Sequence, residues 1–305
     1  MINKVHLGNW TTNQLEDKSV QLIIADPPYF EVKGEFDFVW NSFDDYLKDV
    51  EKWAIECKRV LADNGTLFWY GDAKKIAYTQ IIFDKYFNLL NNIVWENTNQ
   101  SKQSMVNVSG YRSFPPLTER ILMYDKKQET NKNIYKSIMN YIKEERIKTG
   151  WNYTEMDKYL NIKASSCFWD KETSHEYIIP NKDNWIKLQK TGNFKKPYEE
   201  LRKEYDEIRR PFNNCSHLGD VIRLPNYETN KFKHDTIKPE KLTRILLQTC
   251  SRKGDLVLVP FAGSGTECAM AAKEGREFIG FDIESKYVDI ANARCSEHLK
   301  QTSLF

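Results

Sequence analysis

The sequence lacks the cysteine patterns of disulfide-bonded and zinc-binding proteins. It contains six cysteines and no C-x-x-C pair; they are Cys57, Cys167, Cys215, Cys250, Cys268 and Cys295. Scattered thiols of this kind argue against a disulfide framework and against a structural zinc site. We therefore expect reduced, mostly buried thiols and no bound metal.

Long apolar runs are missing as well. No segment approaches the length needed to cross a bilayer, and the N-terminus lacks the basic-then-apolar pattern of a signal peptide. We expect a soluble, cytoplasmic protein that has no membrane partner.

The sequence also lacks a strong net charge. Its 45 Lys and Arg against 43 Asp and Glu give a formal charge of +2, which is too small to identify a nucleic-acid binder. The basic residues are concentrated between Lys126 and Arg210, where 19 Lys and Arg stand against 14 Asp and Glu. This segment is either a solvated helical surface or a face for phosphates. Its candidate contacts are Lys195-Lys196 and Arg209-Arg210.

The order of elements predicts an α/β protein. The predicted strands lie at 5–8, 20–25, 66–70, 92–95, 119–124, 255–259 and 277–281, and the predicted helices at 47–61, 74–83, 242–250 and 267–273. Strands that alternate with helices build a doubly wound sheet. Asn64-Gly65 predicts a turn just before the third strand. A chain of 305 residues can bury one large domain and an insert.

Between residues 126 and 217 the pattern changes to charged helical stretches with aromatic residues. Helices are predicted at 135–148, at 154–160 with Thr154 as N-cap, and at 198–210. We interpret this segment as an inserted helical domain. Its first two helices form either a plain helical hairpin or a helix-turn-helix that reads DNA.

The tetrapeptide Asp26-Pro27-Pro28-Tyr29 follows the apolar strand at 20–25. The two prolines fix φ and keep the chain extended, so the geometry at Asp26 and Tyr29 is restricted in advance. The Asp26 carboxylate and the Pro27 carbonyl can accept two amine hydrogens, while the Tyr29 ring offers a stacking face. This pattern indicates a site that grips a planar amine.

A glycine-rich turn follows the strand at 255–259. Its residues, Pro260 to Thr266, read P-F-A-G-S-G-T and lead into a helix. Such a turn brings bare backbone and a helix N-terminus close to a ligand, although its spacing differs from G-x-G-x-x-G. Asp282 closes the next strand, where Rossmann-like sheets place an acid on ribose hydroxyls.

These motifs, with G-F-D-x-E-x-x-Y at 280–287 and H-D-T-I-K-P at 234–239, resemble the amino-methyltransferases of DNA. Because the tetrapeptide comes first and the glycine loop comes late, the chain resembles the β class of S-adenosylmethionine-dependent DNA adenine N6 methyltransferases. The resemblance covers about residues 5–125 and 218–300. It implies the Rossmann-like mixed sheet of a circularly permuted class I methyltransferase. The catalytic domain would span 1–125 and 218–305, and 126–217 would be the target-recognition domain.

The resemblance also implies the chemistry. Asp26, Pro27, Pro28 and Tyr29 would form the catalytic site, into which an adenine is flipped out of double-stranded DNA. Hydrogen bonds from the amine to Asp26 and to the Pro27 carbonyl would turn the nitrogen toward a sulfonium methyl group. Positioning and electrostatic stabilisation would then account for the rate enhancement, and no cysteine nucleophile or metal is needed.

The implied cofactor is S-adenosyl-L-methionine. Its implied binding residues are Asn9, Asp26, Thr236, Lys238, Phe261, Ala262, Gly263, Ser264, Gly265 and Asp282. Three positions depart from the family pattern. Asn9 stands where Asp is usual, so an amide oxygen would meet the adenine of the cofactor. Val259 stands where an acid or Asn is common, and Asp235 stands where the family has proline.

Two other functions stay open. A cytosine N4 methyltransferase uses the same tetrapeptide position, although Asp at its head favours adenine in the resembled families. The second is a DNA-binding regulator with an inactive methyltransferase fold, and RNA is a further, weaker alternative substrate. The resemblance points to a bacterial or phage-encoded enzyme. It leaves open a homodimer, a cognate restriction enzyme and the recognition sequence.

Overall fold

The computed structural model describes residues 2–32, 37, 39–100, 104, 112–127, 135–163, 177–227 and 237–302. The chain divides into two compact units, Met1–Lys127 with Pro211–Phe305 and Gln128–Arg210. The second unit lies within the segment 126–217 that we interpret as an insert. Its role in target recognition stays a prediction.

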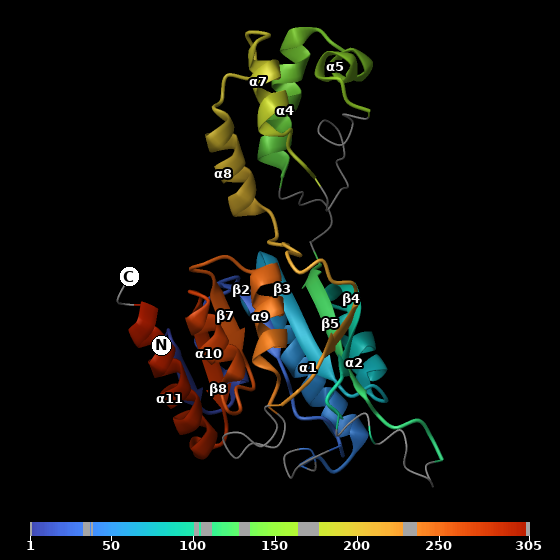
Figure 1. Ribbon diagram of the computed structural model, residues 1–305, viewed down its shortest axis with the longest axis vertical. Helices are drawn as coiled ribbons and strands as arrows, with labels where there is room; N and C mark the ends of the chain where they lie inside the picture. The colour runs from blue at the N-terminus through green and yellow to red at the C-terminus, as the bar shows by residue number, and fades with distance from the viewer. Residues whose placement is uncertain are drawn as a thin grey trace. The chain divides into compact units, whose positions relative to one another are not determined.

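In the described residues, the larger unit is built on one eight-stranded sheet with the order β1-β8-β7-β2-β3-β5-β4-β6 (Figure 1). β5 runs antiparallel to both of its neighbours, and the other described pairs are parallel. The strands are β1 Lys4–Leu7, β2 Val20–Ala25, β3 Leu61–Gly71, β4 Phe87–Asn97, β5 Thr118–Lys126, β6 Val221–Leu224, β7 Leu256–Val259 and β8 Glu277–Asp282. The predicted mixed sheet is confirmed.

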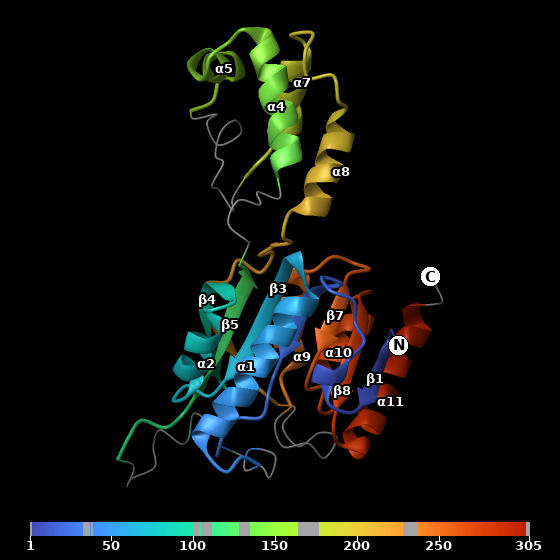
Figure 2. The same ribbon diagram turned by 180° about the vertical axis from the view of Figure 1, so that it is seen from behind.

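Helices cover both faces of this sheet. They are α1 Phe43–Val60, α2 Ile76–Phe83, α9 Glu240–Cys250, α10 Thr266–Lys273 and α11 Ser285–Thr302. Figure 1 shows α9, α10 and α11 in front of the sheet, and Figure 2, from behind, shows α1 and α2 on the opposite face. The fold is therefore the doubly wound α/β architecture that the alternating pattern predicts. No described helix is both long and apolar enough to cross a lipid bilayer.

β2 lies at the centre of both hydrophobic cores. Leu22 and Ile24 pack with α9, α10 and α11, whereas Ile23 and Ala25 pack with α1 and α2. Since side chains alternate between the two faces of a strand, a strand covered on both sides must be apolar throughout. This explains the continuous apolar run before Asp26 and places that residue where the central strand ends.

β3 begins earlier than predicted. The strand begins at Leu61, and Asn64-Gly65 lies inside it. The register with β2 moves from Val20 opposite Leu61 to Leu22 opposite Thr66, so residues 62–65 bulge out of the ladder. Asn64-Gly65 therefore lies in this bulge and does not form a turn between α1 and β3.

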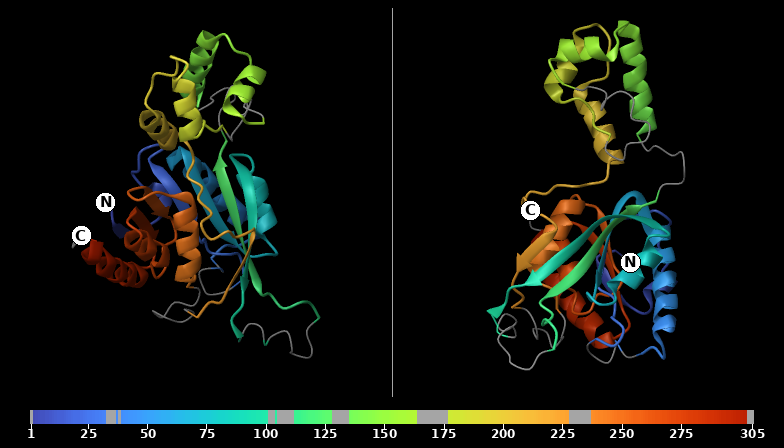
Figure 3. Two further views of the ribbon diagram at one scale, coloured as in Figure 1. Left: turned by 45° about the horizontal axis from the view of Figure 1, so that its top comes forward. Right: turned by 90° about the vertical axis from the view of Figure 1, so that its right-hand side faces the viewer.

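The smaller unit is helical, as predicted, and Figure 3 shows it in two further views. Its described helices are α4 Lys136–Thr149, α5 Tyr153–Leu160, α7 Lys182–Gln189 and α8 Tyr198–Ile208. The predicted N-cap Thr154 is wrong, because Asn152 caps α5. Asn152 Oδ1 accepts from the Glu155 amide at 3.0 Å, and Glu155 Oε2 accepts from the Asn152 amide at 2.8 Å. The two bonds form a capping box.

This unit has a hydrophobic core of its own. Trp185 from α7 and Leu201 from α8 are both fully buried in it. The sequence pattern does not predict α7, and it predicts an exposed α8. Because α8 buries Leu201 and Tyr205 on one side, it is amphipathic and packs against its neighbours.

Candidate active site

The predicted site residues of the sheet follow four neighbouring strands. Asn9 comes two residues after β1, Asp282 is the last residue of β8, Phe261 comes two residues after β7, and Asp26 follows β2. These strands are adjacent and parallel. Since the carboxyl ends of parallel strands meet at one edge of the sheet, the fold brings these residues to the same edge, where α/β proteins bind ligands.

The glycine loop between β7 and α10 is tied to β8. The Ala262 amide donates to the Phe281 carbonyl at 2.8 Å, and the Gly263 amide donates to Asp282 Oδ2 at 2.8 Å. Gly265, with φ +79°, is the N-cap of α10. The loop thus presents backbone at the strand ends, and its contact with Asp282 fixes where that carboxylate lies.

The three other loop residues are covered to different degrees. Ala262 and Ser264 are buried, while Phe261 is partly buried. The Phe261 ring meets Trp53 edge to face at 5.0 Å between ring centroids, and Trp10 at 6.1 Å. The Ser264 carbonyl accepts from Arg294 Nη1 of α11 at 2.7 Å. Because the side chains of Ala262 and Ser264 are buried, they pack inside the protein, and a ligand at this loop would contact its backbone.

Asp282 and Asn9 already make hydrogen bonds to their own loops. Asp282 Oδ1 accepts from the Glu284 amide at 2.8 Å, and Asn9 Oδ1 accepts from the Thr11 amide at 3.0 Å and from Thr11 Oγ1 at 2.9 Å. Each oxygen of a carboxylate has two lone pairs, so Asp282 can still accept from a hydroxyl. The Asn9 oxygen is already used to cap the short helix η1, Trp10–Thr12.

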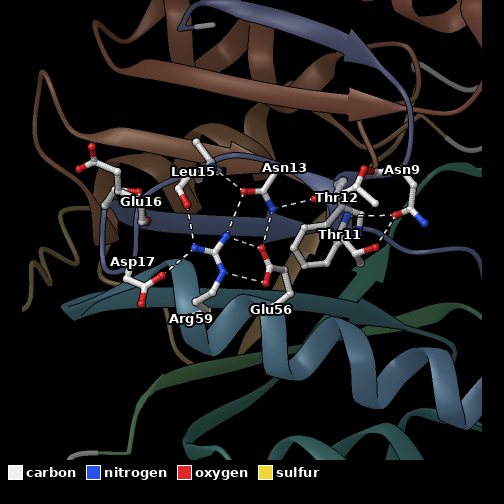
Figure 4. Close-up of polar contacts among 11 residues, drawn as sticks. Asn9, Thr11, Thr12, Asn13, Leu15, Glu16, Asp17, Glu56 and Arg59 are labelled. Atoms are coloured by element: carbon white, nitrogen blue, oxygen red, sulfur yellow. Dashed lines mark hydrogen bonds and ion pairs between the residues drawn. The ribbon is translucent and has the colours of Figure 1, made fainter.

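Arg59 of α1 holds the segment that follows β1 (Figure 4). Its Nη1 donates to the Leu15 carbonyl and to Asp17 Oδ1, both at 2.7 Å, and its Nη2 donates to Asn13 Oδ1 at 3.2 Å. Glu56, one turn earlier on α1, accepts from Arg59 Nε at 2.9 Å and from Asn13 Nδ2 at 2.6 Å. One guanidinium therefore ties residues 13–17 to α1, beside the end of β1.

We expect Arg59→Ala to lower the free energy of unfolding by about 1–3 kcal/mol, because it removes several hydrogen bonds of a charged donor at once. Lys52→Ala on the same helix is the matched control, since Lys52 is exposed and pairs with Asp49 at the surface. Its effect should stay within about 0.5 kcal/mol. Chemical denaturation of both variants measures the difference, and equal losses would contradict the role of Arg59.

Asp26 is held on both of its oxygens. Oδ1 accepts from the Tyr29 hydroxyl at 2.6 Å, and Oδ2 lies 3.0 Å from Lys238 Nζ. The backbone amide of Tyr29 donates in turn to the buried Asp37 carboxylate. Pro27 is buried between these contacts. The tetrapeptide is therefore held at both ends, at Asp26 and at Tyr29.

Lys238 lies between two carboxylates. Its Nζ is 2.9 Å from Glu119 Oε2 as well as 3.0 Å from Asp26 Oδ2. It also lies over the rings of Tyr70 and Tyr29, at 5.1 and 5.6 Å from their centroids. Burial lowers the pKa of Lys238, but the two carboxylates outweigh it and the pKa is raised. The side chain is therefore a buried, charged ammonium.

Burial is the largest influence on the pKa of two carboxyl groups near Lys238, those of Asp26 and Glu267. Burial raises the pKa of Asp26, and the nearby Lys238 cation offsets this only in part. Burial, followed by the charge of Asp26, raises the pKa of Glu267 to about 7. Carboxyl groups whose pKa values are both raised in one cluster are typical of functional sites.

Three residues of this cluster are not predicted from the sequence as part of the site. They are Tyr70 on β3, Glu119 on β5 and Glu267 in the first turn of α10. No described residue hydrogen-bonds to the buried Tyr70 hydroxyl. Nothing in the local pattern marks them, because each lies in an ordinary strand or helix and reaches the site only through the fold. Thr236, a predicted cofactor contact, lies outside the described residues.

Comparisons with known proteins identify the family of this chain. A family model described as DNA methylase, N6_N4_Mtase, matches residues 20–293. The Type II methyltransferase M1.MboII of Moraxella bovis is 29% identical over 297 residues, which cover 95% of each chain. Both the central strand with its tetrapeptide and the glycine loop lie within the matched range.

Two solved structures share the fold. The Thermus thermophilus protein TTHA0409, complexed with S-adenosyl-L-methionine, has 19% identity and a TM-score of 0.54 over 97% of this chain and 95% of that one. The PvuII DNA methyltransferase, which is cytosine-N4-specific, has 13% identity and a TM-score of 0.56 over 97% and 91%. The family model covers most of the sequence, and this chain therefore belongs to the DNA methylase family N6_N4_Mtase.

Proposed function

We propose that the protein is a site-specific DNA methyltransferase that transfers the methyl group of S-adenosyl-L-methionine to the N6 amine of an adenine. The observation that carries this proposal is the position of Asp26. Its carboxylate lies at the end of the central strand, held by Tyr29 and Lys238. The glycine loop and Asp282 lie at the ends of the next two strands. A hydrogen-bond acceptor for an amine thus lies beside a place for a methyl donor.

Asp26 has the acceptor capacity that the reaction needs. The lone pair of an aromatic amine is delocalised into its ring, so the nitrogen must be turned and rehybridised before it attacks. Each oxygen of Asp26 has two lone pairs, so the carboxylate can accept an amine hydrogen and keep a bond to Lys238 or Tyr29. The Pro27 carbonyl accepts the second hydrogen. Positioning and electrostatic stabilisation then supply the rate.

Adenine reaches this site by leaving the double helix. Extrusion costs a few kcal/mol of stacking and pairing, and a tyrosine ring on the base returns about 1–3 kcal/mol. We assign this stacking role to Tyr29, which follows the prolines directly. Its hydroxyl now donates to Asp26 Oδ1, and that oxygen keeps a second lone pair for the arriving amine.

The residues at the strand ends fit S-adenosyl-L-methionine, which supplies the methyl group as a sulfonium. Asp282 keeps lone pairs for ribose hydroxyls, and the Gly263 amide fixes its position. Gly263 and Gly265 present backbone without side chains at the start of α10, where a helix N-terminus favours a carboxylate. We therefore assign the ribose to Asp282 and the methionine part to the glycine loop.

We assign recognition of the target sequence to the helical unit Gln128–Arg210. Within this unit, Lys196 Nζ pairs with Glu204 at 2.7 Å, and Arg209 Nε pairs with Asp206. These two cations are engaged with carboxylates of α8, so we do not count them among the phosphate contacts. The protein as a whole acts on double-stranded DNA in this proposal.

The test is methyl transfer from labelled S-adenosyl-L-methionine to unmethylated genomic DNA, followed by digestion and identification of the nucleoside. We expect N6-methyladenine at one recurring sequence. If N4-methylcytosine were found instead, the target base would be cytosine and the assigned site would stay the same. The fold shared with the cytosine-N4-specific PvuII enzyme supports this alternative. A complete lack of label in DNA would overturn the proposal and favour a binding protein or an RNA substrate.

A further inference from the structure

Lys238 has two negative partners in a buried place. The exposed fractions of the side chains are 6% for Lys238, 20% for Asp26 and 36% for Glu119. A buried ion pair contributes little net stability, because desolvation offsets the attraction. Loss of one partner is costly, because the other charge is then buried alone. Stabilisation of the fold therefore does not explain why Lys238 is buried between two carboxylates.

The groups around Asp26 are mostly negative or neutral. Glu119 faces it from β5, Glu267 from α10 and Tyr70 from β3, and all three carry electrostatic interactions with the Asp26 site. Tyr29 donates to it from the same loop. The positive charge of Arg294 on α11 lowers the pKa of Glu267, and its Nη1 donates to the Ser264 carbonyl. Lys238 is thus the cation in direct contact with Asp26 among the described residues.

We propose that Lys238 is a positioning residue for the reaction: held by Glu119, it keeps the Asp26 carboxylate ionised and turned toward the amine of the base. This inference rests on the proposed function of Asp26. The family resemblance implies a different role for Lys238, a contact with the cofactor. The two roles lead to different measurements, because one acts on the charge of Asp26 and the other on cofactor affinity.

The pH dependence of the reaction separates them. The ionised carboxylate accepts an amine hydrogen more strongly than the protonated carboxyl group does, so activity should fall as the pH drops through the pKa of Asp26. Lys238→Met removes the cation that lowers this pKa, and we expect the acid limb of kcat to move up by about 1–3 pH units. At neutral pH, kcat should fall by the fraction of Asp26 that the raised pKa leaves protonated. Lys238→Arg should restore most of the rate, since it keeps the charge.

Glu119→Gln should move the acid limb the other way. Glu119 raises the pKa of Asp26, and the amide removes this charge while its carbonyl still accepts from Lys238. We therefore expect a smaller shift to lower pH. Lys241→Met is the matched control, because Lys241 is exposed on the first turn of α9. It should leave the profile unchanged.

A direct titration keeps the test independent of turnover. Carboxyl carbon NMR of the ligand-free protein, with Asp26→Asn to assign the signal, should show the Asp26 pKa higher in Lys238→Met and lower in Glu119→Gln. Binding of S-adenosylhomocysteine, measured by calorimetry, should change less than tenfold. Unmoved titration with strongly weakened cofactor binding would overturn the inference. If the wild type transfers no methyl group at any pH, the proposed function fails instead.

Discussion

Asp26→Ala is expected to reduce methyl transfer to DNA by about a hundredfold to a thousandfold while DNA binding stays near that of the wild type. Removal of a single preorganised hydrogen-bond partner of a reacting group costs about 10²–10³ in rate, and Asp26 is the acceptor that orients the amine in our proposal. The DNA contacts that we assign to the helical unit do not involve this residue. Single-turnover rates and a DNA mobility shift measure the two quantities separately.

A matched control and a clear counter-result accompany this variant. Asp49→Ala removes a carboxylate from α1 that pairs with Lys52 and Trp40 and has no part in the site. It should leave the rate unchanged. Because Asp26→Ala leaves Lys238 paired with Glu119, the buried ammonium keeps a partner and the fold should persist. Near-normal methylation by Asp26→Ala would remove the tetrapeptide from the chemistry and with it the proposed function.

The sequence predicts those parts of the site that lie within one strand-turn-helix unit. Asp26 and Tyr29 follow a strand whose two buried faces make it apolar throughout, and the prolines mark its end. The glycine loop is likewise enclosed by a strand and a helix that its own pattern identifies. Such local signals need no knowledge of which strands pair, so these two strands, the loop and the order of motifs can be predicted from the residues alone.

The remaining part of the site depends on long-range pairing. Glu119 reaches Lys238 because β5 pairs with β3 and places Ile121 opposite Tyr70. No property of residues 118–126 indicates that register. The capping residue of α5 is predicted wrongly for a different reason. Asn152 and Thr154 are both good N-caps, and the reciprocal bond from Glu155 decides between them.

Two further elements, β6 and α7, are not predicted from the sequence. β6 has four residues and alternates exposed and buried positions at the edge of the sheet, where it pairs with β4. α7 has eight residues and buries Trp185 and Leu188 among polar neighbours. In both elements the few apolar residues stand among polar ones and show no clear period. They form because a neighbouring strand or helix covers their one apolar side.

Gly265→Ala is expected to destabilise the protein strongly and to abolish cofactor binding. A Cβ at Gly265 would lie 2.6 Å from Ala291 Cβ and 2.8 Å from Ala291 Cα, which are closer than real atoms come and belong to α11. The residue also has φ +79°, a conformation that costs an alanine about 1–2 kcal/mol. With about 1–3 kcal/mol for overpacking, the free energy of unfolding should fall by about 2–5 kcal/mol.

Gly254→Ala separates strain from overpacking. Gly254 has a similar φ of +83°, but nothing lies within 4 Å of its would-be Cβ, so only the conformational cost of about 1–2 kcal/mol applies. Chemical denaturation of both variants gives the overpacking term as their difference. Since Arg294 of α11 binds the Ser264 carbonyl, a displaced α11 also moves the loop, and calorimetry with S-adenosylhomocysteine should show binding lost in Gly265→Ala and kept in Gly254→Ala. Equal stability losses in the two variants would mean that α11 moves aside for the added methyl group without an energetic cost. Intact binding of S-adenosylhomocysteine by Gly265→Ala would contradict a role of the loop in cofactor binding.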